Sequence, residues 1–153
     1  MILPNKMCIF AEINIKNMDR KQFSELLVKQ REQNNIGKNE MCRLTGFTFV
    51  QLQLLEVRPN NFAIKKAIDY LAALHKVIVI YNHRNETTIN NVEKFNKWLV
   101  NKRKKIPIRT LAEMAGCSFS AISHAEQGIS VISIDVFLKI IEALGYEIKI
   151  KSV

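Results

Sequence analysis

Hydrophobic residues recur at helical spacing along most of the chain, and strand-like patterns interrupt them at three places. In the second half the apolar positions predict four helices, over Val92–Lys104, Pro107–Ala115, Ser118–Gln127 and Ile134–Leu144. A fifth short helical segment or a turn is expected at Ile129–Ser133. Strands are expected where residues alternate in Tyr146–Lys151, and where short apolar runs occur in Val77–Tyr81 and Cys8–Ile15.

Three residues set the boundaries between two of these helices. Pro107 suits the first turn of a helix, where its missing N–H has no partner to lose. Gly116 can take the left-handed conformation that ends a helix, and Ser118 can cap the next one. The stretch "LAEMAGCSFSAISHAEQG" (Leu111–Gly128) is therefore predicted to be two short helices joined by a tight turn.

The same pattern occurs twice along the chain, at an offset of 72 residues for the first helix and of 70 residues, the repeat offset, from Met41 onward. "MCRLTGFTFVQLQLLE" (Met41–Glu56) aligns with "LAEMAGCSFSAISHAE" (Leu111–Glu126), which pairs Gly46 with Gly116 and Phe49 with Phe119. The alignment continues at this repeat offset, without a gap, into both strands. Agreement over so many apolar positions indicates two copies of one helical unit.

We therefore predict a mainly α fold with two tandem five-helix units, each followed by a short strand. Pairing of Val77–Tyr81 with Glu147–Lys151 would join the units into a pseudo-twofold body, to which the N-terminal strand could add. The predicted organisation is an N-terminal arm over 1–18, a degenerate unit over 19–81, a linker over 82–91 and a second unit over 92–153.

Charge and cysteine content narrow the class of protein. The 153 residues include 23 Lys and Arg against 14 Asp and Glu, a formal net charge of +9, which favours a polyanionic partner over a basic one. Cys8, Cys42 and Cys117 have neither disulfide nor metal-ligand spacing, so buried free thiols in a reducing compartment are expected. We find no signal-peptide or membrane-span pattern, and we expect a cytoplasmic protein.

The second copy carries a family resemblance. "IPIRTLAEMAGCSFSAISHAEQG" and "ISIDVFLKIIEALG" resemble the helix-turn-helix of the lambda-repressor/Cro (Xre) family, through Leu-Ala, the Gly of the turn, Ser, Ile-Ser and Glu-x-Gly. The first copy is similar but degenerate, because Glu56-Val57-Arg58 replaces the Glu-x-Gly ending. In this family the helix after the turn enters the major groove of DNA, and its first turns contact base edges.

Carried over position by position, the resemblance implies two sets of DNA-contacting residues. In the second copy these are Ser118, Phe119, Ser120, Ala121 and His124, with Gln127 and the Gly128 amide near phosphate. The first copy would offer Thr48, Phe49, Val50, Gln51 and Leu54, with Arg58 nearby. The family often has a backbone-contacting Gln at the start of the second helix; Lys38 and Ile108 occupy that position here, and Arg109 is a possible substitute for Ile108.

Other roles compete with these assignments. Phe49 and Phe119 could be core residues, and His124 could be a surface residue with no role. Leu54 at the position of His124 offers no hydrogen bond, so the first copy could bind a protein instead of DNA.

Charged residues outside the turn have two expected roles. The resemblance implies structural ion pairs between Arg31 and Glu56 and between Arg103 and Glu126, which would fix geometry more than they add stability. The run Lys102–Lys105 would ordinarily be a solvated helix end. Beside a groove-binding helix, Lys104 and Lys105 become candidate phosphate contacts.

No catalytic set is visible in the sequence. His75, His83 and His124 lie in no recognisable motif with an acid or a Cys, and no phosphate-binding loop or metal motif occurs, so no cofactor, metal or enzymatic activity is expected. The leading hypothesis is a sequence-specific regulator that binds double-stranded DNA as a pseudo-dimer within one chain. The alternative is an antitoxin-like or phage-derived interaction module whose first unit and strands bind a protein, either a toxin or a second copy of the chain.

Overall fold

The computed structural model describes residues 18–153. The strand expected at Cys8–Ile15 lies outside the described residues. In the described part of the chain no helix is long and apolar enough to cross a membrane.

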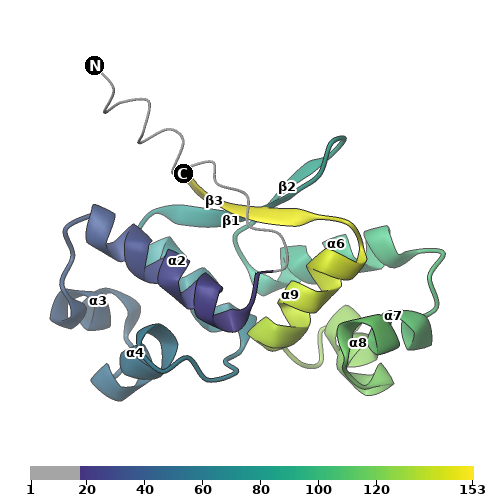
Figure 1. Ribbon diagram of the computed structural model, residues 1–153, viewed down its shortest axis with the longest axis horizontal. Helices are drawn as coiled ribbons and strands as arrows, with labels where there is room; N and C mark the ends of the chain where they lie inside the picture. Colours follow the sequence, from purple (N-terminus) through teal and green to yellow (C-terminus); the bar gives the residue numbers. More distant parts are fainter. Residues whose placement is uncertain (1–17) are drawn as a thin grey trace.

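The described chain is mainly helical, with the helices divided equally between its two halves (Figure 1). The first half contains α2 (Arg20–Gln33), α3 (Lys38–Thr45), α4 (Phe49–Glu56) and α5 (Ile64–Ala73). The second contains α6 (Val92–Arg103), α7 (Ile108–Ala115), α8 (Phe119–Glu126) and α9 (Ile134–Ala143). Corresponding helices α3 and α7, α4 and α8, and α5 and α9 keep the repeat offset at both of their ends.

Local sequence signals account for the turn between α7 and α8. Gly116 ends α7 with φ of +68°, and the Ser118 side chain accepts a hydrogen bond from the Ala121 N–H at the start of α8. Both predictions are confirmed. Pro107 is the residue before α7, whereas the prediction placed it inside the helix as its first residue. Gly46 and Thr48 have the same roles between α3 and α4.

The prediction of five helices in each unit is wrong, because the described chain has four in each half. The segment between α8 and α9 contains a turn and a bend and ends at an isolated β-bridge, with no helix in it. Its Ile132 carbonyl accepts a hydrogen bond from the Ile64 N–H at 3.0 Å, and the Ile134 N–H donates to the Phe62 carbonyl at 2.7 Å. These backbone groups find their partners in the other half of the chain, which a local helix could not provide.

A three-stranded antiparallel sheet joins the two halves. Its strands are β1 (Lys76–Tyr81), β2 (Glu86–Ile89) and β3 (Glu147–Ser152), in the order β2-β1-β3. The predicted pairing of the two long strands is confirmed, with Val77 opposite Lys151 and Tyr81 opposite Glu147. Strand β2 lies within the segment 82–91 that the sequence indicated as a linker, and it pairs with β1 through Ile78 and Ile89.

The elements form three layers (Figure 1). The sheet lies on one side, helices α2, α5, α6 and α9 lie in the middle, and α3, α4, α7 and α8 lie on the opposite side. Buried side chains from the sheet and from both halves belong to one hydrophobic cluster, which includes Phe23, Ile80, Phe137 and Ile148. Helices α4 and α8 are therefore held at opposite ends of the same side of the molecule.

Contacts between the halves are reciprocal, because residues at the repeat offset face each other. Val79 is opposite its equivalent Lys149 in the sheet, and Ala63 is opposite its equivalent Ser133 in an isolated antiparallel bridge. On either side of that bridge, each half donates one backbone hydrogen bond from the first residue of its helix and accepts the equivalent bond from the other half. A pairing that is unchanged when the halves are exchanged is the pattern that a twofold axis produces at an isologous contact.

Candidate nucleic-acid interface

Helix α8 presents a short polar surface directly after the α7–α8 turn. Ser118, Phe119, Ser120 and His124 are exposed, and Ala121 is half-buried. The opposite side of the helix packs into the core through Ile122 and Ala125. Because the apolar side is anchored, the predicted base-contacting residues all belong to the surface that faces away from the core.

A shallow groove of about 500 Å³ between α6 and the end of α8 brings three predicted phosphate contacts together. Lys104, Gln127 and Gly128 line it, with Asn101 and Val100 from α6. The Gly128 amide, which the resemblance places near phosphate, is engaged within the protein. Its N–H already donates to the Ala125 carbonyl at 3.1 Å, because Gly128, with φ of +75°, closes the end of α8.

The four residues of the basic run at the end of α6 have different surroundings. Lys102 lies with its Nζ 6.0 Å from the centre of the Tyr146 ring, and Arg103 is committed to an ion pair. Lys104 and Lys105 are exposed. Arg109 is also exposed, in the first turn of α7. Lys104, Lys105 and Arg109 are therefore exposed cations that can contact a polyanion bound near α8.

An ion pair ties the end of α6 to the end of α8. The Arg103 guanidinium donates two hydrogen bonds to Glu126, from Nε to Oε2 and from Nη2 to Oε1, the second at 2.8 Å. Its Nη1 donates to the Ile106 carbonyl at 2.8 Å. Hydrogen bonding to Glu126 raises the pKa of Arg103. This fork holds α8 against α6, so the pair positions the exposed face of α8 and does not contribute to it.

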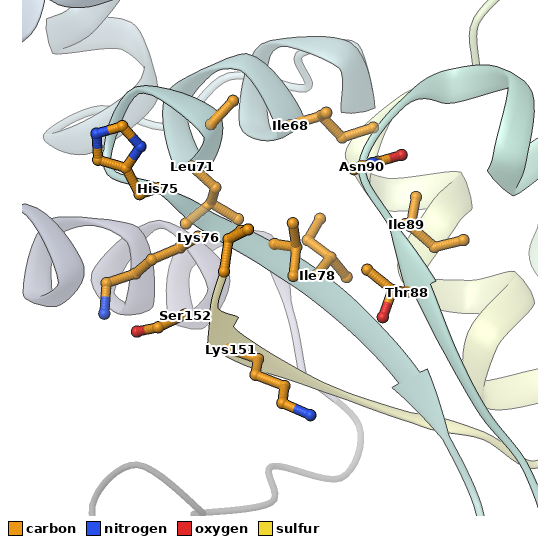
Figure 2. A pocket seen from close by; sticks show the side chains of 13 residues that line it. Ile68, Leu71, His75, Lys76, Ile78, Thr88, Ile89, Asn90, Lys151 and Ser152 are labelled. Carbon is orange, nitrogen blue, oxygen red and sulfur yellow. The ribbon is translucent and has the colours of Figure 1, made fainter.

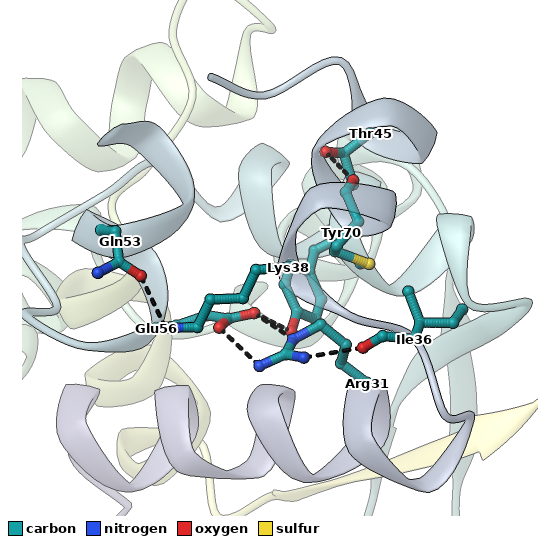
Figure 3. A network of polar contacts seen from close by, with 8 residues as sticks. Arg31, Ile36, Lys38, Thr45, Gln53, Glu56 and Tyr70 are labelled. Atoms are coloured by element: carbon teal, nitrogen blue, oxygen red, sulfur yellow. Dashed lines mark hydrogen bonds and ion pairs between the residues drawn. The ribbon is translucent and has the colours of Figure 1, made fainter. Parts of the chain in front are cut away.

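The equivalent pair in the first half is more deeply buried (Figure 3). Arg31 Nε lies 2.8 Å from Glu56 Oε2, with side-chain exposures of 8% and 1%, against 16% and 11% for Arg103 and Glu126. Arg31 Nη1 donates to the Ile36 carbonyl at 2.8 Å. Both halves therefore use the same fork between an arginine, a glutamate and a loop carbonyl.

Tyr70, which was not among the residues predicted from the sequence, completes the network in the first half. The Tyr70 hydroxyl donates to Glu56 Oε2 at 2.6 Å. Burial and the bond to Glu56 raise the pKa of Tyr70 well above its ordinary value. The repeat contained a signal for this residue, because Tyr70 aligns with the apolar Ile140 and so places a hydroxyl at a core position.

The predicted polar contacts of α4 are largely used within the protein. Thr48 and Gln51 form a capping box, in which each side chain accepts a hydrogen bond from the backbone N–H of the other. Lys38, which occupies the position of the family's backbone-contacting Gln, donates from Nζ to Gln53 Oε1 at 2.9 Å (Figure 3). Arg58 is exposed just beyond the helix.

Helix α4 exposes three apolar side chains. Phe49 is 50% exposed, Val50 66% and Leu54 37%. Phe119 of α8 is 49% exposed, so the alternative that Phe49 and Phe119 are core residues is wrong. The cause is the capping geometry, which places each Phe at the first position of its helix, ahead of the side chains that point inward.

A separate cavity of about 570 Å³ lies between α5 and the sheet, away from these helices (Figure 2). Side chains of Ile68, Leu71, Ile78 and Ile89 surround it, whereas the ammonium groups of Lys76 and Lys151 point away from its centre. None of the predicted DNA-contacting residues lines it. Among residues 18–153, no group of His, Cys, Asp and Glu is arranged to hold a metal ion. The two cysteines in this range, Cys42 and Cys117, are half-buried free thiols.

Comparison with known proteins assigns a domain type to part of the second half. Residues 99–150 match a family model described as a helix-turn-helix. The match runs from the end of α6 through α7, α8 and α9 into β3, and so contains the turn and the exposed helix described above. No curated protein and no solved structure matches the chain significantly. Residues 99–150 are therefore similar to a helix-turn-helix, and this similarity supports a function in DNA binding.

Proposed function

We propose that this protein is a sequence-specific regulator that binds double-stranded DNA, with α8 in the major groove. The observation that carries the proposal is the exposed face of α8, which follows a Gly-terminated helix inside the matched helix-turn-helix region. Ser118, Ser120 and His124 can hydrogen-bond base edges or phosphates, and Phe119 can contact a thymine methyl. The exposed Arg109, Lys104 and Lys105 supply phosphate contacts.

The two halves of one chain would act as a built-in pseudo-dimer. Reciprocal contacts between equivalent residues and the placement of α4 and α8 on one side support this arrangement. An operator read in this way is an imperfect palindrome with half-sites about one helical turn apart. The net charge of +9 supports association with a polyanion.

Enrichment from randomised duplex DNA tests the proposal. We expect the purified chain to enrich one sequence, with information concentrated in at least one half-site. Ser120→Ala combined with His124→Ala should reduce binding to the enriched duplex without unfolding the chain. The proposal fails if no sequence is enriched, or if the double variant binds and discriminates like the parent.

The second candidate is a protein-interaction module of the antitoxin-like kind, in which α4 and the strands hold a partner. The exposed Phe49, Val50 and Leu54 favour it, because clustered apolar residues at a surface often mark protein contacts. Co-purification from the native cell tests it. A stoichiometric protein that is retained by the parent and released by Leu54→Asp would favour this function over DNA reading by the first half.

A further inference from the structure

Helices α4 and α8 share a position in the fold but differ in the chemistry they expose. At the repeat offset, Val50 occupies the position of Ser120, and Leu54 occupies that of His124. Phe49 and Phe119 are exposed to almost the same extent, so the first helical position is alike in both. The difference therefore lies further along each helix, where α4 has aliphatic groups and α8 has a hydroxyl and an imidazole.

The side-chain oxygens that α4 retains accept hydrogen bonds from the protein itself. The carbonyl oxygen of the Gln51 side chain accepts from the Thr48 N–H at 2.9 Å, and the Thr48 hydroxyl accepts from the Gln51 N–H at 3.1 Å. Gln53 is engaged by Lys38. In α8 the position of Gln51 is Ala121, and Ser120 and His124 remain exposed. At the two positions where α4 has Val50 and Leu54, α8 thus offers exposed hydrogen-bonding groups.

Helix α4 nevertheless lies on the same side of the molecule as α8. Both helices lie on the side of the molecule away from the sheet (Figure 1). The bridge between Ala63 and Ser133 and the pairing of β1 with β3 fix the two halves to each other. A straight duplex that meets α8 therefore continues towards α4, and the exposed Arg58 beyond α4 supplies a cation there.

Aliphatic side chains can recognise one feature of a base pair in the major groove, the C5 methyl group of thymine. We propose that α4 reads the second half-site through thymine methyl groups, which Val50 and Leu54 contact, whereas α8 reads its half-site by hydrogen bonds. The operator would then have two chemically different half-sites. The inference rests on the proposed DNA-binding function and specifies how the first half contributes to it.

Replacing thymidine with deoxyuridine tests the proposed methyl contacts directly. The change removes the C5 methyl group and leaves every hydrogen-bonding group of the base in place. The half-site of α8 is first identified as the one in which His124→Ala relaxes base discrimination. Single deoxyuridine substitutions are then made in the other half-site of the enriched duplex. We expect at least one of these substitutions to weaken binding about fourfold, because the complex no longer buries one methyl group.

A double-mutant cycle assigns the effect to α4. In Val50→Ala, or in Leu54→Ala if that residue makes the contact, the same deoxyuridine substitution should no longer change affinity. Ser120→Ala, at the position of Val50 in the other half, is the matched control and should keep the full deoxyuridine effect. Thermal unfolding of each variant shows whether the fold is retained; Val50 is the most exposed of these apolar residues, so Val50→Ala should unfold like the parent.

Three results would overturn the inference. If both half-sites are needed but no deoxyuridine substitution matters, α4 does not read methyl groups. If the half-site opposite α4 can be randomised without loss, α4 is not on DNA and its apolar surface is left for a protein partner. If no duplex is enriched at all, the proposed function fails together with the inference.

Discussion

Ala63 and Ser133 occupy equivalent positions in the two halves and lie opposite each other in an antiparallel bridge, just before α5 and α9. Val79 and Lys149 are also equivalent residues, and they lie opposite each other in the sheet. The first contact directly precedes α5 and α9, and the second lies in the sheet. Together these contacts fix the two halves of the chain to each other.

The buried fork in the first half should matter more for stability than its counterpart. Glu56→Gln leaves the Arg31 guanidinium buried without a countercharge and should reduce the free energy of unfolding by about 3–5 kcal/mol. Glu126→Gln is the matched variant, and it should cost clearly less because Arg103 and Glu126 are more exposed. Urea unfolding followed by the fluorescence of Trp98 measures both. Equal losses would contradict the proposed difference in burial.

Tyr70 should make stability fall at alkaline pH. Its pKa is raised in the folded protein above the ordinary value of 10.0, so folding favours the protonated hydroxyl. This contribution is complete below about pH 10 and is lost as the pH rises above it, because the unfolded chain then releases the proton first. Tyr70→Phe should be less stable than the parent at pH 8, and the difference should shrink by pH 11. A difference that stays constant over this range in urea unfolding would contradict the assignment.

The sheet should couple the two halves energetically. Ile80 and Ile148 are buried and lie opposite each other in the pairing of β1 with β3. Each change to Ala should cost about 2–5 kcal/mol, because it removes buried methyl and methylene groups and leaves a cavity. The double variant should lose less than the sum, with an interaction of at least about 0.5 kcal/mol. Strict additivity in denaturant unfolding would show that these side chains do not pack against each other.

Salt dependence should distinguish cations that contact DNA from those that do not. Lys104→Ala and Lys105→Ala should each reduce the slope of log affinity against log salt by about 1, the value expected for one lost phosphate contact. Lys151→Ala is the control, because Lys151 is exposed on β3, on the side of the molecule away from α8. Titrations at several salt concentrations give the slopes. An equal change for Lys151→Ala would indicate a diffuse charge effect instead of contacts beside α8.

The local signals that the sequence carried were reliable where one residue type has one physical advantage. Glycine adopts a positive φ without strain, and a serine hydroxyl can accept from the first turn of a helix, so Gly116 and Ser118 marked the turn correctly. The pairing of β1 with β3 followed from apolar runs that repeat at the same offset as the helices.

Long-range contacts and backbone hydrogen bonds were harder to predict from the sequence. Strand β2 has one buried apolar residue, Ile89, and three polar ones, so its pattern does not differ from that of a loop. The bond between Tyr70 and Glu56 joins residues 14 positions apart on different helices, and a spacing rule does not reveal it. The family resemblance implies that the Gly128 amide lies near phosphate. Its hydrogen bond to the Ala125 carbonyl depends on the local backbone conformation, which the resemblance does not reveal.

Base discrimination by His124→Ala on the enriched duplex tests the central claim most directly. The affinity of parent and variant is measured for that duplex and for every single-base-pair change in it. If α8 reads base edges, the variant should lose discrimination at one position by about 1–3 kcal/mol and keep it elsewhere. An unchanged profile, or a loss spread evenly over all positions, would contradict the assignment of α8 as the helix that reads DNA.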